Sequence, residues 1–348
     1  MDTSHRAIRF HAFGGLERLR LEEVPTRGPG GDEALVRVFA AAVNHLDLDL
    51  LAGTSRYEVH VPHTLGMEGA GVVEAVGADV TTASPGDRVL VATDVVCGHC
   101  TFCASGRNNL CTDAFRPGLT HSGAYSELMV LPARGLYRLP DQISFDSAAS
   151  TQVSFGTAWH MLMTRGRLRA GETVLVMGAA GNIGLGAVRI AKLAGARVIA
   201  ASASAEKRRR LQDEETDVTV DPSSPQFVNS VFQATDGHGV DIVYEHVGGN
   251  LLQKGLDCLR PGGRLVTCGA HGGEVASIDV IPFFRSELTI IGSNSASSDE
   301  IATVFRLVGQ GKLVSTIGAV FPLGRAADAL GLLVERGHYG RIVIRPQE

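Results

Sequence analysis

A glycine-rich turn between an apolar strand and a helix constrains the fold of this 348-residue chain more than any other segment. The stretch reads VLVMGAAGNIGLGAVRIAKLAGARVIAAS, with Gly178, Gly181 and Gly184 spaced as G-x-x-G-x-x-G. Glycine permits a tight turn, lets a diphosphate approach the backbone, and allows the helix to pack closely on the strand. The free N–H groups at the start of that helix then face the negative charge. The stretch therefore predicts a dinucleotide cradle within a parallel sheet.

The character of the chain changes near Ser150. The residues before it are rich in strand-like segments such as EALVRVFAAAV, punctuated by glycine and proline. The segment SAASTQVSFGTAWHMLMTRGRL then has helical periodicity. From Glu172 onward, strands that are apolar on both faces, such as VDIVYEHVG, alternate with helices such as AEKRRRLQDEE. We therefore predict an α/β protein of two domains, one β-rich and one a doubly wound parallel sheet.

Composition narrows the class of partner. The formal net charge is −5 and no basic stripe occurs, so we expect neither nucleic acid nor an anionic membrane as a partner. The chain contains no run of eighteen apolar residues, so the sequence predicts no membrane-spanning helix. The start MDTSHRAIRF is polar and lacks the apolar core of a signal peptide, so we expect a cytoplasmic protein.

The end of the second strand of the parallel sheet carries a signal for cofactor choice. An NAD site usually has an Asp or Glu there, for the ribose 2′-hydroxyl. This chain has Ser202, Ala203 and Ser204, followed by Lys207 and Arg208. Serine hydroxyls and Lys207 can bind a 2′-phosphate, so we predict NADP(H) rather than NAD(H). In the alternative interpretation, the two cations belong to the solvated face of a surface helix, an interpretation that Glu206 favours slightly.

Four of the six cysteines fall within fifteen residues, in the segment CGHCTFCASGRNNLC. They are Cys97, Cys100, Cys103 and Cys111. In a reducing compartment such a cluster indicates a metal site before a disulfide. Four thiolates complete a tetrahedral Zn²⁺ shell and leave no position for a substrate. The run of closely spaced cysteines also suits an iron–sulfur cluster, but the long last spacing and Thr112 after it favour zinc.

The whole chain resembles the medium-chain dehydrogenase/reductase superfamily, in its zinc-binding alcohol dehydrogenase and quinone oxidoreductase branch. The segments that carry the resemblance are AAVNHLDLDLLAG, LGMEGAGVVEAVG, PGDRVLV, the cysteine cluster, FGTAWHML, VLVMGAAGNIG, DCLRPGGRLVTCGA, IIGSN and HYGRIVIRP. The resemblance implies a GroES-like catalytic domain at residues 1–153 and 296–348, a Rossmann domain at 154–295, and an active site in the cleft. It also implies a homodimer or homotetramer, which fits an exposed edge strand at LTIIGSN.

The resemblance also implies roles for particular residues. It identifies the four cysteines as the ligands of one structural zinc, in a lobe at about 95–113. It places His246 near the cofactor ribose, although His246 is equally well interpreted as a satisfied buried imidazole. The residues predicted to bind the cofactor are Thr157, Gly178, Ala180, Gly181, Asn182, Ile183, Gly184, Ser202, Ser204, Lys207, Val247, Gly269, Ala270, His271 and Ser293.

The resemblance fails at the catalytic zinc. Zinc-dependent relatives supply a Cys, a His and usually a second Cys, where this chain has Asn44, Met67 and approximately Val153. An amide, a thioether and an alkyl group do not build a Lewis-acid zinc site. Glu68 remains, where those relatives keep a glutamate beside the metal. We interpret Met67 as an apolar wall near the nicotinamide.

The zinc-free relatives imply hydride transfer to an activated C=C bond, in an enone or enoyl thioester, or to a quinone. A developing enolate then needs hydrogen-bond donors and a proton. We predict Asn44 beside the nicotinamide or the substrate carbonyl, with Asp47 either in the same site or as a local cap. Tyr57, His45 and water are candidate proton donors. The alternatives are an alcohol dehydrogenase or carbonyl reductase with a non-standard site, and a biosynthetic or non-catalytic nucleotide-binding protein.

Overall fold

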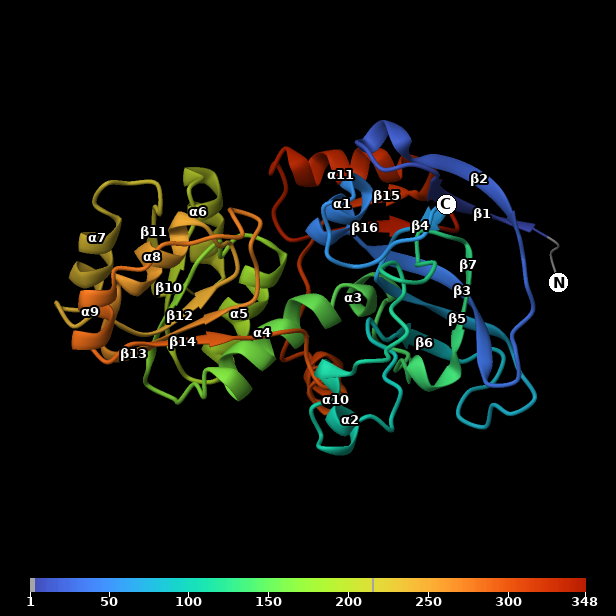
Figure 1. Cartoon of the computed structure of the whole chain (residues 1–348), viewed down its shortest axis with the longest axis horizontal. Coiled ribbons are helices and arrows are strands. Elements are labelled where there is room, and N and C mark those ends of the chain that lie inside the picture. The colour runs from blue at the N-terminus through green and yellow to red at the C-terminus, as the bar shows by residue number, and fades with distance from the viewer. Residues whose placement is uncertain (1–3, 215) are drawn as a thin grey trace. The chain divides into compact units, whose positions relative to one another are not determined.

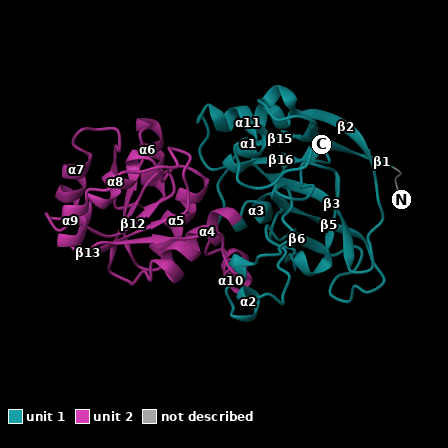
Figure 2. Cartoon of the chain, viewed as in Figure 1, with its two compact units in different colours: residues 1–152, 314–348 teal, residues 153–313 magenta. Residues whose placement is uncertain are grey.

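A computed structural model describes residues 4–214 and 216–348. The chain forms two compact units, which Figure 2 distinguishes by colour. Unit 1 comprises residues 1–152 and 314–348, and unit 2 comprises residues 153–313. The return to unit 1 therefore comes later than the position near 296 expected from the sequence, because helix α10 (Ser298–Gly309) packs within unit 2. There Glu300 accepts a hydrogen bond from His160 at 2.9 Å.

Unit 2 is built on a six-stranded parallel sheet, as the apolar strands predicted. The strand order is β11-β10-β9-β12-β13-β14, which is 3-2-1-4-5-6 in chain order and defines the doubly wound Rossmann topology (Figure 1). Its strands are β9 (Thr173–Val176), β10 (Arg197–Ala201), β11 (Val218–Val220), β12 (Val240–Glu245), β13 (Leu259–Thr267) and β14 (Thr289–Gly292).

Helices connect these strands, because parallel strands require crossovers. Helix α5 packs on β9 and β10, and helix α8 packs on β12 and β13. The predicted helical segment that opens unit 2 is helical but irregular, with two π-helical turns around a short α-helix, at Gln152–Gly156, Thr157–Trp159 (α4) and His160–Arg165. The other helices are α5 (Asn182–Leu193), α6 (Ala205–Asp213), α7 (Phe227–Ala234), α8 (Asn250–Leu256) and α9 (Val280–Arg285).

Unit 1 is dominated by a seven-stranded sheet, and β1, β2 and β4 form a small second sheet. The central strand β3 pairs antiparallel with β5, β7 and β16. The strands are β1 (Ser4–Phe10), β2 (Arg20–Pro25), β3 (Glu33–Ala42), β4 (His63–Thr64), β5 (Glu68–Val76), β6 (Arg88–Val91), β7 (Leu128–Pro132), β8 (Leu136–Arg138), β15 (Ile317–Pro322) and β16 (Arg341–Arg345).

The register of these strands brings distant residues together. Ala42, the last residue of β3, lies opposite both Glu68 at the start of β5 and Val343 of β16. The end of β3 therefore meets the beginning of β5 and the middle of β16. Unit 1 also contains α1 (His45–Ala52), α2 (Thr101–Ala104), α3 (Phe145–Ala149), α11 (Ala326–Val334) and short 3₁₀ turns at Leu16–Arg18, Asn108–Leu110, Ala133–Gly135 and Leu323–Arg325.

The predicted fold class, a β-rich domain with a parallel-sheet domain, is confirmed. Within residues 4–214 and 216–348, no helix has both the length and the hydropathy that crossing a bilayer requires.

Candidate active site and metal centre

The glycine-rich turn connects β9 to α5, as predicted. Gly178 has φ +62°, in the left-handed region that glycine adopts without strain. A Cβ at Gly184 would lie 2.3 Å from the Gly178 carbonyl oxygen, so any larger residue would force the turn open. Gly181 is the N-cap of α5 and provides no side-chain cap, which leaves the N–H groups of the first turn directed at an incoming ligand. The turn has the shape of a diphosphate cradle.

The ends of β12 and β13 converge beside this turn. A Cβ at Gly178 would lie 3.1 Å from Nε2 of His246, and one at Gly269 would lie 2.2 Å from the His246 carbonyl oxygen. Two buried polar atoms here, Nε2 of His246 and Oγ of Ser293, have no hydrogen-bond partner among the described residues. Buried polar groups normally have partners, so orphaned atoms at this edge indicate a ligand site. The role of His246 beside a cofactor stays a prediction.

Burial makes His246 a neutral group. Desolvation lowers the pKa of His246 to about 4, and His271 nearby contributes in the same direction. The imidazole is therefore uncharged at neutral pH. Its ring lies 5.6 Å from the ring of Tyr244, in an edge-on arrangement. A neutral imidazole at this position can donate to or accept from a ligand hydroxyl or amide.

The end of β10 holds the residues predicted to select the cofactor. Ser202 is buried, and Ser204 caps α6 by accepting a hydrogen bond from the Lys207 backbone N–H at 3.3 Å. Arg208, which the sequence prediction named only as a neighbouring cation, turns back over this end. Its guanidinium donates to the carbonyl oxygens of Ser202 at 2.6 Å and Ala203 at 2.9 Å. Arg208 comes four residues after the cap Ser204, so the two residues lie on one face of α6. This spacing is the sequence signal that could have identified Arg208.

The predicted cofactor residues thus all lie in unit 2, and the predicted catalytic residues all lie in unit 1. In unit 2, Ala180, Asn182 and Ile183 belong to the glycine-rich turn and the start of α5, and Thr157 begins α4. Val247, Ala270 and His271 follow β12 and β13 in loops. The role of each in binding stays a prediction.

In unit 1, Asn44, Glu68 and Arg341 form a closed buried network. Asn44 Nδ2 donates to Glu68 Oε2 at 3.1 Å, and Arg341 Nη1 donates to Asn44 Oδ1 at 3.3 Å. Arg341 Nη2 completes the triangle with an ion pair to Glu68 Oε2. All three side chains are withdrawn from water, with residue exposures of at most 5%. Sequence analysis did not single out Arg341, since nothing local links it to Glu68.

Asp47 lies beneath this network at the start of α1. Its Oδ2 accepts hydrogen bonds from the Asn44 backbone N–H at 2.8 Å and from the Tyr125 hydroxyl at 2.7 Å. The first contact is half of a capping box, so the local-cap interpretation of Asp47 describes its contacts. Burial raises the pKa of Asp47 to about 6, and the hydrogen bonds oppose this shift.

Met67 and Tyr57 lie outside the network. Met67 is half-buried and packs against the hydrophobic core of unit 1. Tyr57 is partly exposed, and its ring lies 5.9 Å from the Arg116 guanidinium. Partial burial raises the pKa of the Tyr57 phenol, and Asp94 adds to the shift. Tyr57 therefore stays protonated at neutral pH, which a proton donor requires.

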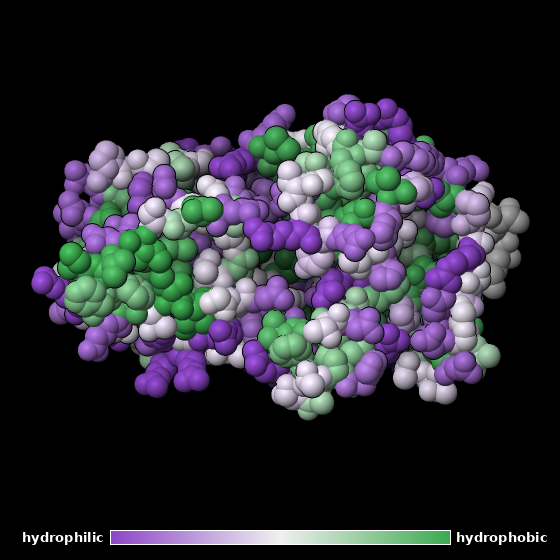
Figure 3. Space-filling view, in the orientation of Figure 1, coloured by the Kyte–Doolittle hydropathy of each residue, from purple (hydrophilic) through white to green (hydrophobic). Residues whose placement is uncertain are grey.

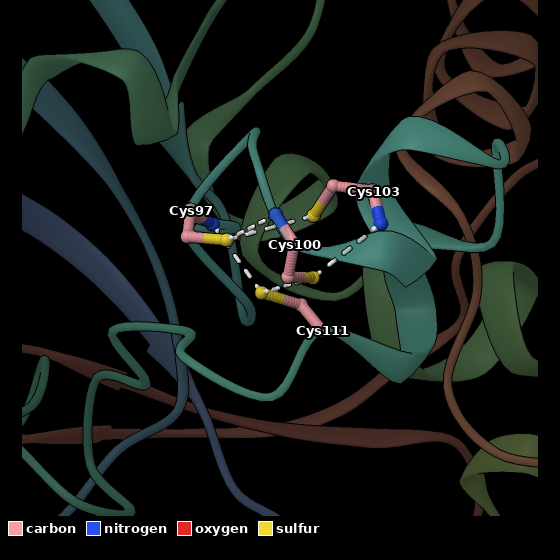
Figure 4. A group of neighbouring side chains, drawn as sticks. All are labelled: Cys97, Cys100, Cys103 and Cys111. Atoms are coloured by element: carbon pink, nitrogen blue, oxygen red, sulfur yellow. Dashed lines mark hydrogen bonds between the residues drawn. The ribbon is translucent and has the colours of Figure 1, made fainter.

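The four clustered cysteines converge on one point, as Figure 4 shows. Their sulfur atoms all lie within 4.8 Å of one another, and two pairs are separated by 3.9 Å and 4.0 Å. A tetrahedral zinc with 2.3 Å bonds requires sulfur atoms about 3.8 Å apart. Backbone N–H groups of Cys97 and Cys100 also donate hydrogen bonds to the sulfurs of Cys111 and Cys97, both at 3.3 Å. The cluster fits a structural zinc.

Comparison with known proteins identifies the family. Residues 30–141 match the alcohol dehydrogenase GroES-like domain, and residues 182–310 match the zinc-binding dehydrogenase family. A quinone oxidoreductase of Pseudomonas aeruginosa is 32% identical over 98% of this chain and 99% of its own length. The chain belongs to the medium-chain dehydrogenase/reductase superfamily. It is an oxidoreductase of that superfamily, whose members use a nicotinamide cofactor on small molecules.

Two further relatives of this medium-chain dehydrogenase/reductase differ in activity. A solved structure described as an NAD-dependent alcohol dehydrogenase is 36% identical to this chain, with a TM-score of 0.92. The match covers 98% of this chain and 99% of that structure's chain. A phenolphthiocerol/phthiocerol polyketide synthase of Mycobacterium tuberculosis is 31% identical over 95% of this chain, which corresponds to 14% of that protein. These similarities agree with the superfamily that the domain matches identify.

The donor set does not suit a catalytic zinc in this medium-chain dehydrogenase/reductase. Among residues 4–214 and 216–348, only the cysteine cluster gathers three or more His, Cys, Asp or Glu ligands. Near the position where zinc-dependent relatives bind the metal, Glu68 is ion-paired with Arg341 and Asn44 is bonded to both. Oxygen ligands already paired with a buried cation are poor partners for a second one.

Removing the cation of the buried network leaves the Glu68 carboxylate buried without a positively charged partner. We expect Arg341→Met to lower the free energy of unfolding by about 3–5 kcal/mol, measured by urea denaturation. Arg345→Met on the same strand is the control, because its ion pair with Asp146 is partly exposed, and we expect it to cost at most about 1 kcal/mol. The double variant Glu68→Gln/Arg341→Met should cost less than Arg341→Met alone. Equal costs for Arg341→Met and Arg345→Met would contradict the network.

Asp47 makes stability depend on pH. Its pKa is raised from 3.8 to about 6, so its stabilising contribution is complete below pH 3.8 and disappears as the pH rises through 6. We expect the free energy of unfolding of Asp47→Asn, relative to the wild type, to rise by about 2.5 kcal/mol between pH 4 and pH 7. Asp49→Asn on the same helix is the control. Parallel pH profiles for the wild type and Asp47→Asn would refute the assignment.

Proposed function

We propose that the chain is an NADPH-dependent reductase that transfers hydride to an activated C=C bond, in an enone or enoyl thioester, or to a quinone, without a catalytic zinc. One observation carries the proposal. Among the described residues, only the four cysteines form a cluster that could hold a metal ion, and Glu68 and Asn44 are bonded to Arg341 instead. Four thiolates close the zinc shell, so that ion braces a loop and takes no part in catalysis. The proposal includes a cytoplasmic location, because a reducing compartment keeps four clustered cysteines available for a metal.

Unit 2 provides the cofactor site of this proposal. The glycine-rich turn and the N-terminus of α5 hold the diphosphate, and the residues after β10 hold the adenosine ribose. His246 and Ser293 offer unpartnered polar atoms to the other half of the dinucleotide. When bound, NADPH supplies the hydride. These residues suit a dinucleotide because the glycine-rich turn exposes its backbone, and a Cβ at Gly184 would have no room.

Unit 1 provides the groups that orient the substrate. The proposal assigns Asn44, Asp47 and Glu68 to a rigid polar surface below the substrate. These side chains are held in place, because Asn44 and Glu68 contact Arg341 and Asp47 accepts a hydrogen bond from Tyr125. Met67 is the apolar wall beside it. Tyr57 is the proposed proton donor to the developing enolate, since its phenol stays protonated at neutral pH. An enolate needs donors rather than a Lewis acid, so this reaction does not require a metal.

Reduction of carbonyl compounds is the second candidate. It is favoured by the 36% identity to a structure described as an NAD-dependent alcohol dehydrogenase. In that case a second metal, or a hydrogen-bond donor close to the substrate oxygen, would have to polarise the carbonyl. The donor set around Asn44, Met67 and Glu68 argues against the metal.

One assay distinguishes the two candidates. We expect the purified protein to oxidise NADPH with quinones, enones or enoyl thioesters, and not with aldehydes or alcohols. We expect Tyr57→Phe to lower kcat by about 10²-fold with little change in KM. The measurement is the absorbance of NADPH, with metal content determined on the same sample. Aldehyde reduction together with two metal ions per chain would overturn the proposal in favour of the alcohol dehydrogenase.

Zinc removal provides the matched control for this assay. We expect one zinc per chain, and we expect turnover to fall only in step with loss of folded protein when a chelator removes it. Circular dichroism and NADPH binding on the same samples report the folded fraction. Loss of turnover while fold and NADPH affinity persist would mean that the ion takes part in catalysis.

The proposal includes a homodimer formed through unit 2. Strand β14 is an edge of the six-stranded sheet, and α9 nearby exposes apolar side chains. Figure 3 shows hydrophobic surface over this part of unit 2, which holds Val275, Ile278, Val280, Ile281 and Phe284. An open edge beside an apolar patch suits pairing with a second copy about a two-fold axis, which extends the sheet and covers the patch.

A charge in the patch tests the dimer. We expect Val280→Asp to shift the protein from dimer to monomer in sedimentation experiments, because the carboxylate would be buried without a partner. Val334→Asp on α11 of unit 1 is the matched control, since Val280 is 64% exposed and Val334 is 58% exposed. A wild type that is monomeric at micromolar concentration, or two variants with the same effect, would refute this surface as the interface.

A further inference from the structure

An ion pair lies at the carboxyl ends of two neighbouring strands of the parallel sheet. Arg208 of α6 and Asp221, the residue after β11, approach to 3.1 Å. The same guanidinium nitrogen, Nη1, also contacts the carbonyl oxygens of Ser202 and Ala203 after β10. Both side chains are partly exposed, at 22% and 30%. The pair is thus a surface feature that a ligand can reach.

This ion pair is continuous with the dinucleotide cradle. The Ala179 N–H of the glycine-rich turn donates to the Ala201 carbonyl at the end of β10, at 2.9 Å. The Ser202 N–H donates to Val220 at the end of β11, at 3.0 Å. The cradle and the two strand ends therefore form one hydrogen-bonded edge. In this topology the adenosine ribose lies beyond the end of the second strand, which is β10 here.

Asp221 is firmly held in its ionised form. Its Oδ1 accepts hydrogen bonds from the Ser223 backbone N–H at 2.9 Å and the Ser223 hydroxyl at 2.5 Å. These bonds hold the pKa of Asp221 below its ordinary value. Lys254 of α8 donates to the neighbouring Pro222 carbonyl at 2.9 Å, which tethers the same loop. The carboxylate therefore does not move away easily when an anion arrives.

The charges on this edge act against each other. A phosphate on the ribose 2′-oxygen would gain a charge-assisted bond from Arg208. The same phosphate would have to share Arg208 with Asp221, because one guanidinium cannot bond fully to both anions. A ribose with a free 2′-hydroxyl would not compete with Asp221 in this way. The ion pair thus reduces the advantage of NADPH over NADH.

We propose that Asp221 limits the cofactor preference of this protein by competing with the 2′-phosphate of NADPH for Arg208. The inference rests on the proposed function, because it assumes that a nicotinamide dinucleotide binds in unit 2. It identifies Asp221 as a residue that affects cofactor specificity through Arg208. It also predicts that the wild type accepts both NADPH and NADH, with a modest preference for NADPH.

Equilibrium binding tests the role of Asp221 without any substrate. NADPH and NADH are titrated against the full chain, with binding followed by nicotinamide fluorescence. We expect Asp221→Asn to tighten NADPH by about tenfold and to leave NADH within about twofold, because only the charge is removed. We expect Arg208→Gln to weaken NADPH by about tenfold and to leave NADH unchanged. The same pattern is expected for adenosine 2′-phosphate against adenosine 5′-phosphate, used as competitors.

The double variant and a control make the inference falsifiable. If Asp221 acts through Arg208, the double variant Asp221→Asn/Arg208→Gln binds NADPH like Arg208→Gln alone. Arg209→Gln makes the same charge change at an exposed neighbouring position, and we expect less than a twofold effect. Equal effects of Asp221→Asn on NADPH and NADH, or a gain that persists in the double variant, would overturn the inference.

These outcomes are distinct from failure of the proposed function. If the binding changes occur as expected but no quinone, enone or enoyl thioester is reduced, only the proposed reaction is wrong. If the reduction occurs but Asp221→Asn leaves the ratio of the two affinities unchanged, only the inference is wrong. If the protein binds neither dinucleotide, both are wrong.

Discussion

The buried contact between Arg341 and Glu68 is the constraint on which unit 1 depends. A cation and a carboxylate that are both withdrawn from water are tolerable only when they are paired and hydrogen-bonded. The pair therefore requires the start of β5 and the middle of β16 to lie beside the end of β3. Asn44 uses both ends of its amide to complete the contact, and this fixes the first residue before α1. The geometry of the candidate site follows from this one requirement.

The molecule separates metal binding from the residues proposed for catalysis. The cysteine cluster organises its own lobe, with three of its four ligands within seven residues and a sulfur arrangement that suits a closed zinc shell. The network around Arg341 takes up the oxygen ligands that a second metal would need. The glycine-rich turn in unit 2, which we propose holds the cofactor, has a backbone that leaves no room for a Cβ at Gly184. The cysteine cluster, the buried network and the glycine-rich turn therefore arise from different physical requirements.

The sequence predicted the features that depend on neighbouring residues. The strand, turn and helix around Gly178 to Gly184 correspond to β9 with α5, and the strand expected at 33–43 corresponds to β3 (Glu33–Ala42). The helix expected at 205–215 corresponds to α6 (Ala205–Asp213), with residue 215 outside the described residues. The cysteine cluster was evident from spacing alone. The return to unit 1 was expected near 296 but comes at 314, because α10 is held in unit 2 by the bond between Glu300 and His160. Arg341 was missed because 273 residues separate it from Glu68.

The sequence by itself determined the class of fold, the glycine-rich turn and the four-cysteine cluster, because each depends on periodicity or spacing within a few turns of chain. The resemblance of segments along the whole chain indicated the superfamily. Only the tertiary structure decided which partners the polar residues take. It pairs Asn44 and Glu68 with Arg341, Asp47 with Tyr125, and Arg208 with Asp221. These pairings depend on strand register and on the order of strands in a sheet, and no local pattern in a single sequence specifies either.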